Sequence, residues 1–295
     1  MRINNNIPAL NTHRMLGITN SSLEKTLEKL SSGKRINRAS DDAAGLAISQ
    51  KMEAQIRGLK QASRNALDGI SLIQTAEGAL NEVQAMLQRM RELAVQGANG
   101  IYDEEDLEAI ANEIKELTEQ IDKISKDTEF NGIPLLKGKI GEEDNDTKLR
   151  LQIGSNSEQY IEIDISQINI TVTDNNDGLG IIGGIIEKNE DGFKIIDELT
   201  QSDFEEAISI YDAAVQAVSS KRSFLGAIQN RLEHTIRNVD NTTENLTSAK
   251  SRIEDADMAI EMSEFVKLNI LQQAGTAMLS QANQLPQSVL QLLQR

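Results

Sequence analysis

Residues 59–97 read LKQASRNALDGISLIQTAEGALNEVQAMLQRMRELAVQG, and their non-polar side chains recur at alternating spacings of three and four. This spacing is typical of coiled coils when it is held over several heptads, and here it predicts a helix of about 50 residues that packs lengthwise against a partner. The first column of this repeat contains Leu59, Ala66, Ile73, Leu80, Leu87 and Ala94, and the second contains Ala62, Gly69, Ala76, Val83, Met90 and Gly97.

Two further runs have the same spacing. Residues 107–124 predict a shorter helix that folds back on the first and stops near the sequence FNGIP at 130–134. Residues 225–260 predict a helix as long as the first, with Leu225, Leu232, Val239, Leu246, Ile253 and Ile260 in one column and Ile228, Thr235, Thr242, Ala249 and Ala256 in the other.

Two long helices that each expose an apolar seam can bury both seams most simply by packing against each other. We therefore predict a mainly α fold, an elongated rod of coiled-coil-like helices whose N- and C-terminal halves pack side by side. The residues expected to form the seam of this rod are Leu59, Ile73, Leu80, Leu87, Leu225, Leu232, Val239, Leu246 and Ile253.

The pattern changes between residues 138 and 200, where apolar residues alternate with polar ones. The alternation predicts short strands at 149–153, 160–165 and 168–172. A segment of this length can form a few hairpins but no large second domain. We expect a small β-hairpin insert that caps the rod near its turn.

The ends of the chain are also expected to be helical, but their apolar residues are sparse. Neither end has enough apolar residues to form a stable helix alone, so we expect neighbouring segments or molecules to cover their apolar faces. The resulting division is 1–43 and 251–295 for the two terminal helical parts, 44–137 and 201–250 for the two halves of the rod, and 138–200 for the insert.

Composition and charge exclude several classes of function. The chain of 295 residues has no Cys and no Trp, which excludes disulfides, thiolate chemistry and Cys-built metal sites. Its net charge is −16, and the acidity is central, because residues 101–210 hold 28 acidic and 9 basic side chains. The few basic clusters, such as Lys34 and Arg35 with Arg38, are too short to form a face that binds phosphate backbones, so nucleic acid is not an expected partner.

No pattern predicts catalysis, a metal or a cofactor. Residues 178–183 fit G-x-G-x-x-G, but the next eight residues leave no room for the helix that a dinucleotide site needs, and a loop is the expected structure. The two histidines, His13 and His234, lie in different zones. The sequence shows neither an apolar run after a basic start nor a stretch of eighteen apolar residues, so neither a cleaved signal peptide nor a membrane span is expected.

Several segments near the two ends resemble bacterial flagellins. They include LSSGKRIN at 30–37, DDAAG at 41–45, QASRNA at 61–66, LGAIQNRL at 225–232, SRIEDAD at 251–257 and ILQQAG at 270–275. The resemblance covers most of the N-terminal 140 and the C-terminal 90 residues. The short insert implies a form of flagellin that lacks large outer domains.

The resemblance implies a non-enzymatic subunit that polymerises into the flagellar filament for motility. The family's terminal helices form the inner tube of the filament, and its members are exported unfolded through the flagellar type III apparatus. The implied partners are further copies of the chain, an export chaperone, and the filament cap and hook-associated proteins, and the implied location is extracellular, in the flagellum. Two alternatives remain open: the protein that joins hook to filament, and a coiled-coil adaptor that does not polymerise.

Two further partner sites follow from the resemblance. Residues 87–96 are similar to the segment that Toll-like receptor 5 contacts, which implies contacts at Gln88, Arg89, Glu92, Leu93, Gln96 and Glu113. Arg89 and Leu93 would be the anchors, replaceable without unfolding the rod, although the same segment can instead serve packing between subunits. The end of the chain resembles the part held by the chaperone and by cytosolic immune sensors, which implies contacts at Leu285, Val289, Leu290, Leu292, Leu293 and Arg295.

Overall fold

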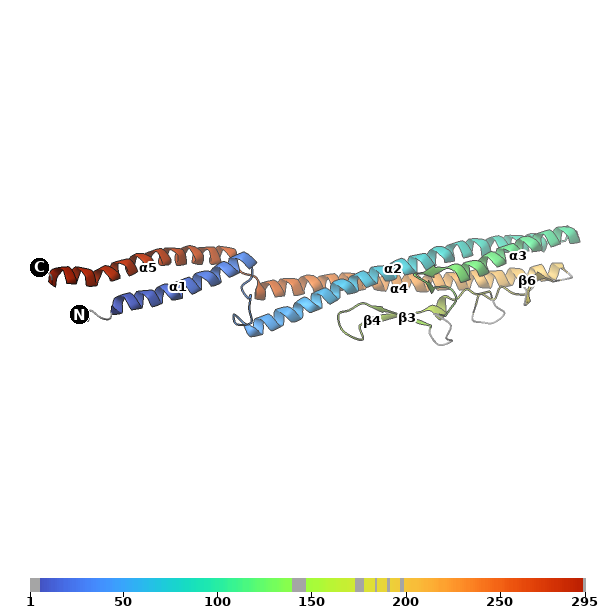
Figure 1. Cartoon of the computed structure of the whole chain (residues 1–295). Coiled ribbons are helices and arrows are strands. Elements are labelled where there is room, and N and C mark those ends of the chain that lie inside the picture. The colour runs from blue at the N-terminus through green and yellow to red at the C-terminus, as the bar shows by residue number, and fades with distance from the viewer. Residues whose placement is uncertain are drawn as a thin grey trace. The chain divides into compact units, whose positions relative to one another are not determined.

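The computed structural model describes residues 6–139, 147–172, 178–183, 185–189, 192–196 and 199–293 (Figure 1). Its α-helices are α1 (Ile7–Ser32), α2 (Ala43–Gly97), α3 (Glu104–Asp127), α4 (Gln201–Glu254) and α5 (Met258–Leu293). Three antiparallel hairpins pair β1 (Glu129–Phe130) with β2 (Ile133–Pro134), β3 (Lys148–Gln152) with β4 (Tyr160–Asp164), and β5 (Ile186–Asn189) with β6 (Gly192–Ile195). The prediction of a mainly α chain with long helices packed side by side and small hairpins is confirmed.

The chain forms two compact units. One is continuous in sequence and comprises Arg57–Thr242. The other combines the two ends, Met1–Ile56 and Thr243–Arg295. We call them the central unit and the terminal unit.

The core of the central unit follows the heptad columns of α2. All twelve positions of the two columns, from Leu59 to Gly97, are buried. The seven-residue repeat keeps one stripe of the helix facing its neighbours over this whole length, which is why small residues such as Ala62 and Ala76 are as buried as Leu80. The long helix is therefore stabilised by packing along one stripe.

The partner that α2 meets in this unit is α4, which runs antiparallel to it. Ser63 Oγ lies 3.3 Å from Asp240 Oδ1 near one end of the contact, and Arg91 Nε donates to Asp212 Oδ1 at 2.5 Å nearer the other. Within α4, Leu225, Leu232 and Val239 are buried. These contacts bring segments about 120 to 180 residues apart in sequence next to one another.

The column that was predicted to run from Leu225 to Ile260 continues into the terminal unit, and its last positions there are less buried than those in the central unit. Leu246 and Ile253 are half-buried. Ile260 is 64% exposed and belongs to α5, because α4 ends at Glu254. The break follows from Asp257, whose Oδ1 accepts hydrogen bonds from the backbone N–H groups of Ala259 and Ile260 and so caps the start of a new helix.

Helix α3 folds back on α2 within the central unit, but its inner face differs from the expected one. Leu117 and Ile124 are half-buried, whereas Thr118 and Ser125 are fully buried. Their hydroxyls donate to backbone oxygens of the same helix at 2.8 Å, Thr118 to Ile114 and Ser125 to Asp122. Because these small side chains satisfy their own polar groups, α3 can present them to the core without leaving a hydroxyl unpaired.

The insert contains the expected β3–β4 hairpin, whose Ile161 and Ile163 face the core. The expected strand at 168–172 is wrong. Asp164 Oδ1 accepts from the N–H of Ser166, which starts a short 3₁₀ helix at Ile165–Ile168, and Asn169 Oδ1 accepts from the N–H of Thr171. These local bonds replace a strand ladder, although Ile168, Ile170 and Val172 still point inward at alternate positions.

The insert contacts both long helices of the central unit, and its β6 strand packs against α3. Asn65 Nδ2 of α2 donates to the carbonyl oxygen of Gln152 at 3.0 Å, and Leu151 packs against Gly69. Lys221 Nζ of α4 lies 3.5 Å from the carbonyl oxygen of Gln167. The described parts of the insert therefore lie along α2, α3 and α4, and their isoleucines join the same hydrophobic core as the helices.

In the terminal unit, α1 and α5 pair as antiparallel helices (Figure 1). Asn6 Nδ2 donates to the carbonyl oxygen of Ala282 at 2.8 Å near the free ends, and Lys29 Nζ pairs with Glu261 at 3.1 Å near the base. Asn6 also caps α1, because its Oδ1 accepts from the N–H of Ala9. None of the described helices combines the length and the apolar character needed to span a bilayer.

Candidate functional site

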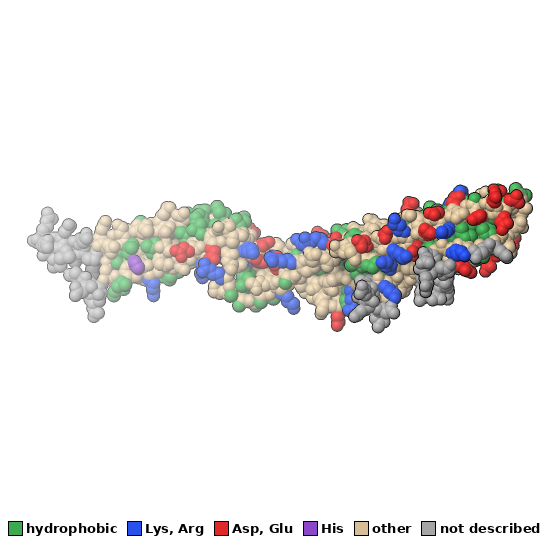
Figure 2. Space-filling model, turned by 45° about the vertical axis from the view of Figure 1, so that its right-hand side comes forward, with side chains coloured by type: hydrophobic (Ala, Val, Ile, Leu, Met, Phe, Trp, Pro, Cys, Tyr) green, Lys and Arg blue, Asp and Glu red, His purple; other side chains and the backbone are tan. Residues whose placement is uncertain are grey.

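The most unusual surface of the molecule lies on α1 and α5. Seventeen large hydrophobic side chains of the described residues are exposed, and twelve of them belong to these two helices. Figure 2 shows hydrophobic side chains gathered over this part, where few charged groups interrupt them. The twelve are Ile7, Leu10, Met15, Ile18, Leu27, Met258, Ile260, Met262, Val266, Ile270, Leu271 and Met278, and we call them the apolar face.

The apolar face is exposed because the seam between α1 and α5 takes up only one stripe of each helix. The inward positions of α1 repeat at spacings of three and four and alternate apolar with polar: Ala9, Thr12, Leu16, Thr19, Leu23, Thr26 and Leu30. Of the residues in both helices whose burial is described, only Thr26, Leu268 and Ala282 are buried. A pair of helices this weakly packed is marginal in water, and an exposed apolar surface of this extent marks an interaction site.

The base of the α1–α5 pair is held by a buried carboxylate. Glu254 is 6% exposed and forms ion pairs with Lys34 and Lys250, the latter at 3.7 Å. Lys250 also contacts Glu53 of α2 at 2.5 Å, and this hydrogen bond raises the pKa of Lys250. An unpaired charge is costly in a protein interior, so the buried Glu254 carboxylate needs the ammonium groups of Lys34 and Lys250 beside it.

Backbone hydrogen bonds also hold the base of the α1–α5 pair together. The N–H of Arg35 donates to the carbonyl oxygen of Glu254 at 2.6 Å, and the N–H of Ala256 donates to that of Gly33 at 3.0 Å. These two hydrogen bonds join the segment that follows α1 to the segment that precedes α5. We call this arrangement, with the Glu254 ion pairs, the clamp.

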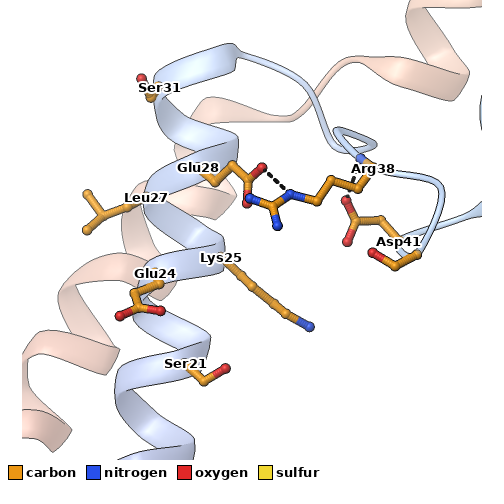
Figure 3. A pocket seen from close by; sticks show the side chains of 9 residues that line it. Ser21, Glu24, Lys25, Leu27, Glu28, Ser31, Arg38 and Asp41 are labelled. Atoms are coloured by element: carbon orange, nitrogen blue, oxygen red, sulfur yellow. Dashed lines mark hydrogen bonds and ion pairs between the residues drawn. The ribbon is translucent and has the colours of Figure 1, made fainter.

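A polar hollow of about 770 Å³ lies beside the clamp, between α1 and the loop that follows it (Figure 3). Arg38 Nε reaches from the loop to Glu28 Oε1 at 2.9 Å, and Lys25 extends from α1 toward the loop. Asp41 Oδ2 accepts from the N–H groups of Arg38 and Asn37, and these bonds lower the pKa of Asp41. The charged groups here fix the loop.

Among the described residues, no cluster of three or more His, Asp or Glu side chains could hold a metal ion. The run at 178–183 buries Leu179 and Ile181 in the core of the central unit and leads into the β5 strand. These residues have a structural role in the fold.

The residues expected to contact a receptor form one exposed patch, except for Leu93. Gln88, Arg89, Glu92, Gln96 and Glu113 are exposed. Arg89 bridges α2 and α3, with Nη2 2.9 Å from Glu113 Oε1 and Nη1 3.5 Å from Glu92 Oε2, and the Glu113 hydrogen bond raises the pKa of Arg89.

Leu93 corrects the expectation of a replaceable surface anchor. It is 3% exposed and belongs to the hydrophobic core, so replacing it by a small side chain would leave a cavity and destabilise the central unit. Leu93 lies four residues after exposed Arg89 on the same helix, but the core of the central unit is wide enough to cover it.

The residues expected to bind a chaperone cannot be placed as side chains. Leu285, Val289, Leu290, Leu292 and Leu293 belong to α5, but their side chains lie outside the described part of the structure. Arg295 lies outside the described residues altogether.

The clamp was missed by sequence reasoning. Lys250 and Glu254 stand four residues apart on one helix, a spacing that is visible in the sequence but is common on solvent-exposed helices. Lys34, the other partner of Glu254, comes from a segment 220 residues away. Nothing in the sequence alone pairs these two segments.

Comparison with known proteins agrees with the geometry. The bacterial flagellin N-terminal helical region matches residues 3–140, and the bacterial flagellin C-terminal helical region matches residues 208–293. A flagellin of Halalkalibacterium halodurans is 51% identical over 99% of this chain and all of its own length, and a flagellin of Bacillus subtilis is 53% identical over the same shares.

A solved structure adds a likeness of fold. A Vibrio parahaemolyticus protein provisionally assigned as flagellar hook-associated aligns with a TM-score of 0.57 over 73% of this chain and all of its own, at 14% identity. The family models cover most of the chain, and the two flagellins match it from end to end. This chain therefore belongs to the bacterial flagellin family, whose members are structural subunits of the flagellar filament.

Proposed function

We propose that this chain polymerises into the flagellar filament through the apolar face of α1 and α5. The observation that supports this is the concentration of twelve exposed large hydrophobic side chains on two weakly paired helices. A surface of this kind is stable when copies of the chain cover it, and contacts between unlike surfaces of identical subunits generate an open helical polymer. In this proposal residues 1–43 and 251–295 form the inner tube, and the remainder forms the rod with its insert at 138–200.

Seeded elongation tests the proposal. Purified chain is added to short filament fragments, and growth is followed by negative-stain electron microscopy. We expect the chain in which Ile7, Leu10, Ile260 and Ile270 are all replaced by Ser to fail to elongate the seeds, as should a chain that lacks residues 1–43 and 251–295.

The matched control carries Ser at Leu67, Val95 and Ile101, which are 52%, 50% and 78% exposed on the central unit. It should elongate at a substantial fraction of the normal rate. Equal loss in both variants, or normal elongation by the first, would show that the apolar face is not the polymerising surface. If the unaltered chain elongates no seeds, the junction protein or the adaptor becomes the better candidate.

We further propose that the chain is exported unfolded through the flagellar type III apparatus. The absence of Cys supports this, since no disulfide can lock a fold before passage. The chain should accumulate in the medium of a host with an intact flagellar export apparatus and stay inside an export-deficient strain. Within the same scheme, deletion of residues 285–295 should abolish the complex with the export chaperone, which a pull-down from purified components can measure.

We also propose that Toll-like receptor 5 recognises the patch around Arg89. The exposed Arg89–Glu113 pair on two helices of the central unit supports this, because it presents a positioned guanidinium. A reporter-cell assay should show a large loss of signalling for Arg89→Ala with Glu113→Ala. The control is another exposed cross-helix pair, Arg91 with Asp212, replaced by Ala in the same way. Equal signalling by the two double variants would refute the assignment.

A further inference from the structure

The methionines of this chain are distributed unevenly between surface and core. Met15, Met258, Met262 and Met278 are 54%, 46%, 49% and 60% exposed, and all four belong to the apolar face of α1 and α5. The other methionines within the described residues are covered: Met90 is fully buried, and Met52 and Met86 are half-buried. The accessible sulfur atoms of the described residues thus all belong to α1 and α5.

These thioethers are also the most easily oxidised groups that the chain offers. The sequence contains no Cys and no Trp, so a two-electron oxidant such as hydrogen peroxide finds no thiol or indole to react with first. In the reaction, the Sδ lone pair attacks one peroxide oxygen and the O–O bond breaks. The sulfur gains that oxygen and is oxidised to the sulfoxide, and the other oxygen takes up the transferred proton and leaves as water.

Oxidation at these positions changes the chemistry of the surface. Met258 and Met262 begin a row that continues at the same four-residue spacing with Val266 and Ile270, and all four side chains are exposed. A sulfoxide is polar and accepts hydrogen bonds from water, so placing it in this row puts a strongly hydrated group among aliphatic ones. Covering the row would then remove water from a group that has no partner in it.

We propose that these four methionines make the apolar face sensitive to peroxide: oxidation blocks the addition of a free subunit, and assembly protects the same sulfur atoms. The inference rests on the proposed function, because it requires that the apolar face be covered in the filament. Methionine sulfoxide is reducible by the two stereospecific sulfoxide reductases, so the block is reversible.

The test compares subunit and filament under the same dose of hydrogen peroxide. Peptide mass spectrometry measures the oxidation of each methionine, and seeded elongation measures the consequence. In the free subunit we expect the four exposed methionines to oxidise first while Met90 stays reduced. The oxidised subunit should elongate seeds more slowly by about tenfold or more, and treatment with both reductases should restore the rate.

Two variants separate the sites. The chain with Leu at Met15, Met258, Met262 and Met278 keeps an apolar side chain of similar volume at each position and should elongate equally well before and after peroxide. The control with Leu at Met52 and Met86 should remain sensitive. Continued sensitivity of the first variant, or normal elongation by the fully oxidised natural chain, would overturn the inference.

The protection measurement distinguishes a failure of this inference from a failure of the proposed function. If the four methionines are protected in filaments but their oxidation leaves elongation unchanged, the sensitivity is refuted and assembly through the apolar face stands. If they oxidise equally fast in filaments and in free subunits, the apolar face is not covered, and both ideas fall together.

Discussion

Replacing Gly97 by Ala should destabilise the central unit, although Ala is the better helix former. Gly97 is the last residue of α2, and it packs against the ring of Phe204 in the first turn of α4. A Cβ at this position would overlap Cδ1 and Cε1 of that ring and lie 2.9 Å from its Cγ. Phe204 is fully buried, so the ring has no free space to move into.

The magnitude follows from two opposed terms. Overpacking a filled core costs about 1–3 kcal/mol, and overlap with a buried ring places this substitution near the upper value. Exchanging Gly for Ala in a helix returns roughly 0.5–1 kcal/mol. The net expected loss is about 2 kcal/mol. The control is Gly78→Ala in the same helix, where no atom lies within 4 Å of the added Cβ and the full gain should appear as stabilisation.

Urea unfolding of the free subunit, followed by circular dichroism at 222 nm, measures both effects. Gly97→Ala should lower the free energy of unfolding, whereas Gly78→Ala should raise it. Adding Phe204→Leu to Gly97→Ala should recover about 1 kcal/mol or more relative to the sum of the single changes, because the two sites are in contact. Gly97→Ala as stable as the natural chain, or strictly additive effects in the double variant, would refute the steric reasoning.

Three further predictions concern single side chains. Leu87→Ala should lower the free energy of unfolding by about 2–5 kcal/mol, since Leu87 is fully buried; exposed Gln88 replaced by Ala should change it by less than about 0.5 kcal/mol in the same urea titration. The Asp41 carboxylate stabilises the fold above its ordinary pKa of 3.8 and loses that effect as the pH falls through its lowered folded pKa. Melting curves of Asp41→Asn and the natural chain should therefore differ at neutral pH and converge in strong acid. The Tyr211 hydroxyl has no hydrogen-bond partner among the described residues, and burial raises its pKa. Tyr211→Phe should stabilise the chain by about 1 kcal/mol at pH 7 and should lose less stability above pH 10, where the unfolded tyrosine ionises and the folded one does not; a lower melting temperature for the variant would show that the hydroxyl has a partner.

The long helices could be predicted because their information is local and repeated. Every heptad of α2 restates which stripe faces inward, so the positions from Leu59 to Gly97 could be placed without knowing the partner. The insert has no such redundancy. At Ile168–Val172 the alternation correctly indicates which side chains point inward, but two side-chain oxygens, of Asp164 and Asn169, decide between a strand and a turn.

Some residues of the candidate site could likewise be predicted from the local sequence, and others could not. Exposed charges such as Arg89 and Glu113 follow from the helical pattern, because each lies off the apolar stripe of its helix. The burial of Leu93 depends on how three helices meet, and the clamp depends on bringing Lys34 to Glu254 across most of the chain. Contacts of this kind are properties of the assembled fold, which no window of sequence contains.

The antiparallel pairing of α1 and α5 has a mechanical consequence. The helices are fastened at their base by the clamp, and the hydrogen bond between Asn6 and Ala282 lies near their free ends. A force that draws the two chain ends apart therefore loads the contacts one after another from the tip, as in opening a zipper. Sequential rupture needs far less force than shearing the whole interface at once. The pair is thus easily separated by pulling, and its separation should stop at the clamp, where backbone and charged bonds must break together.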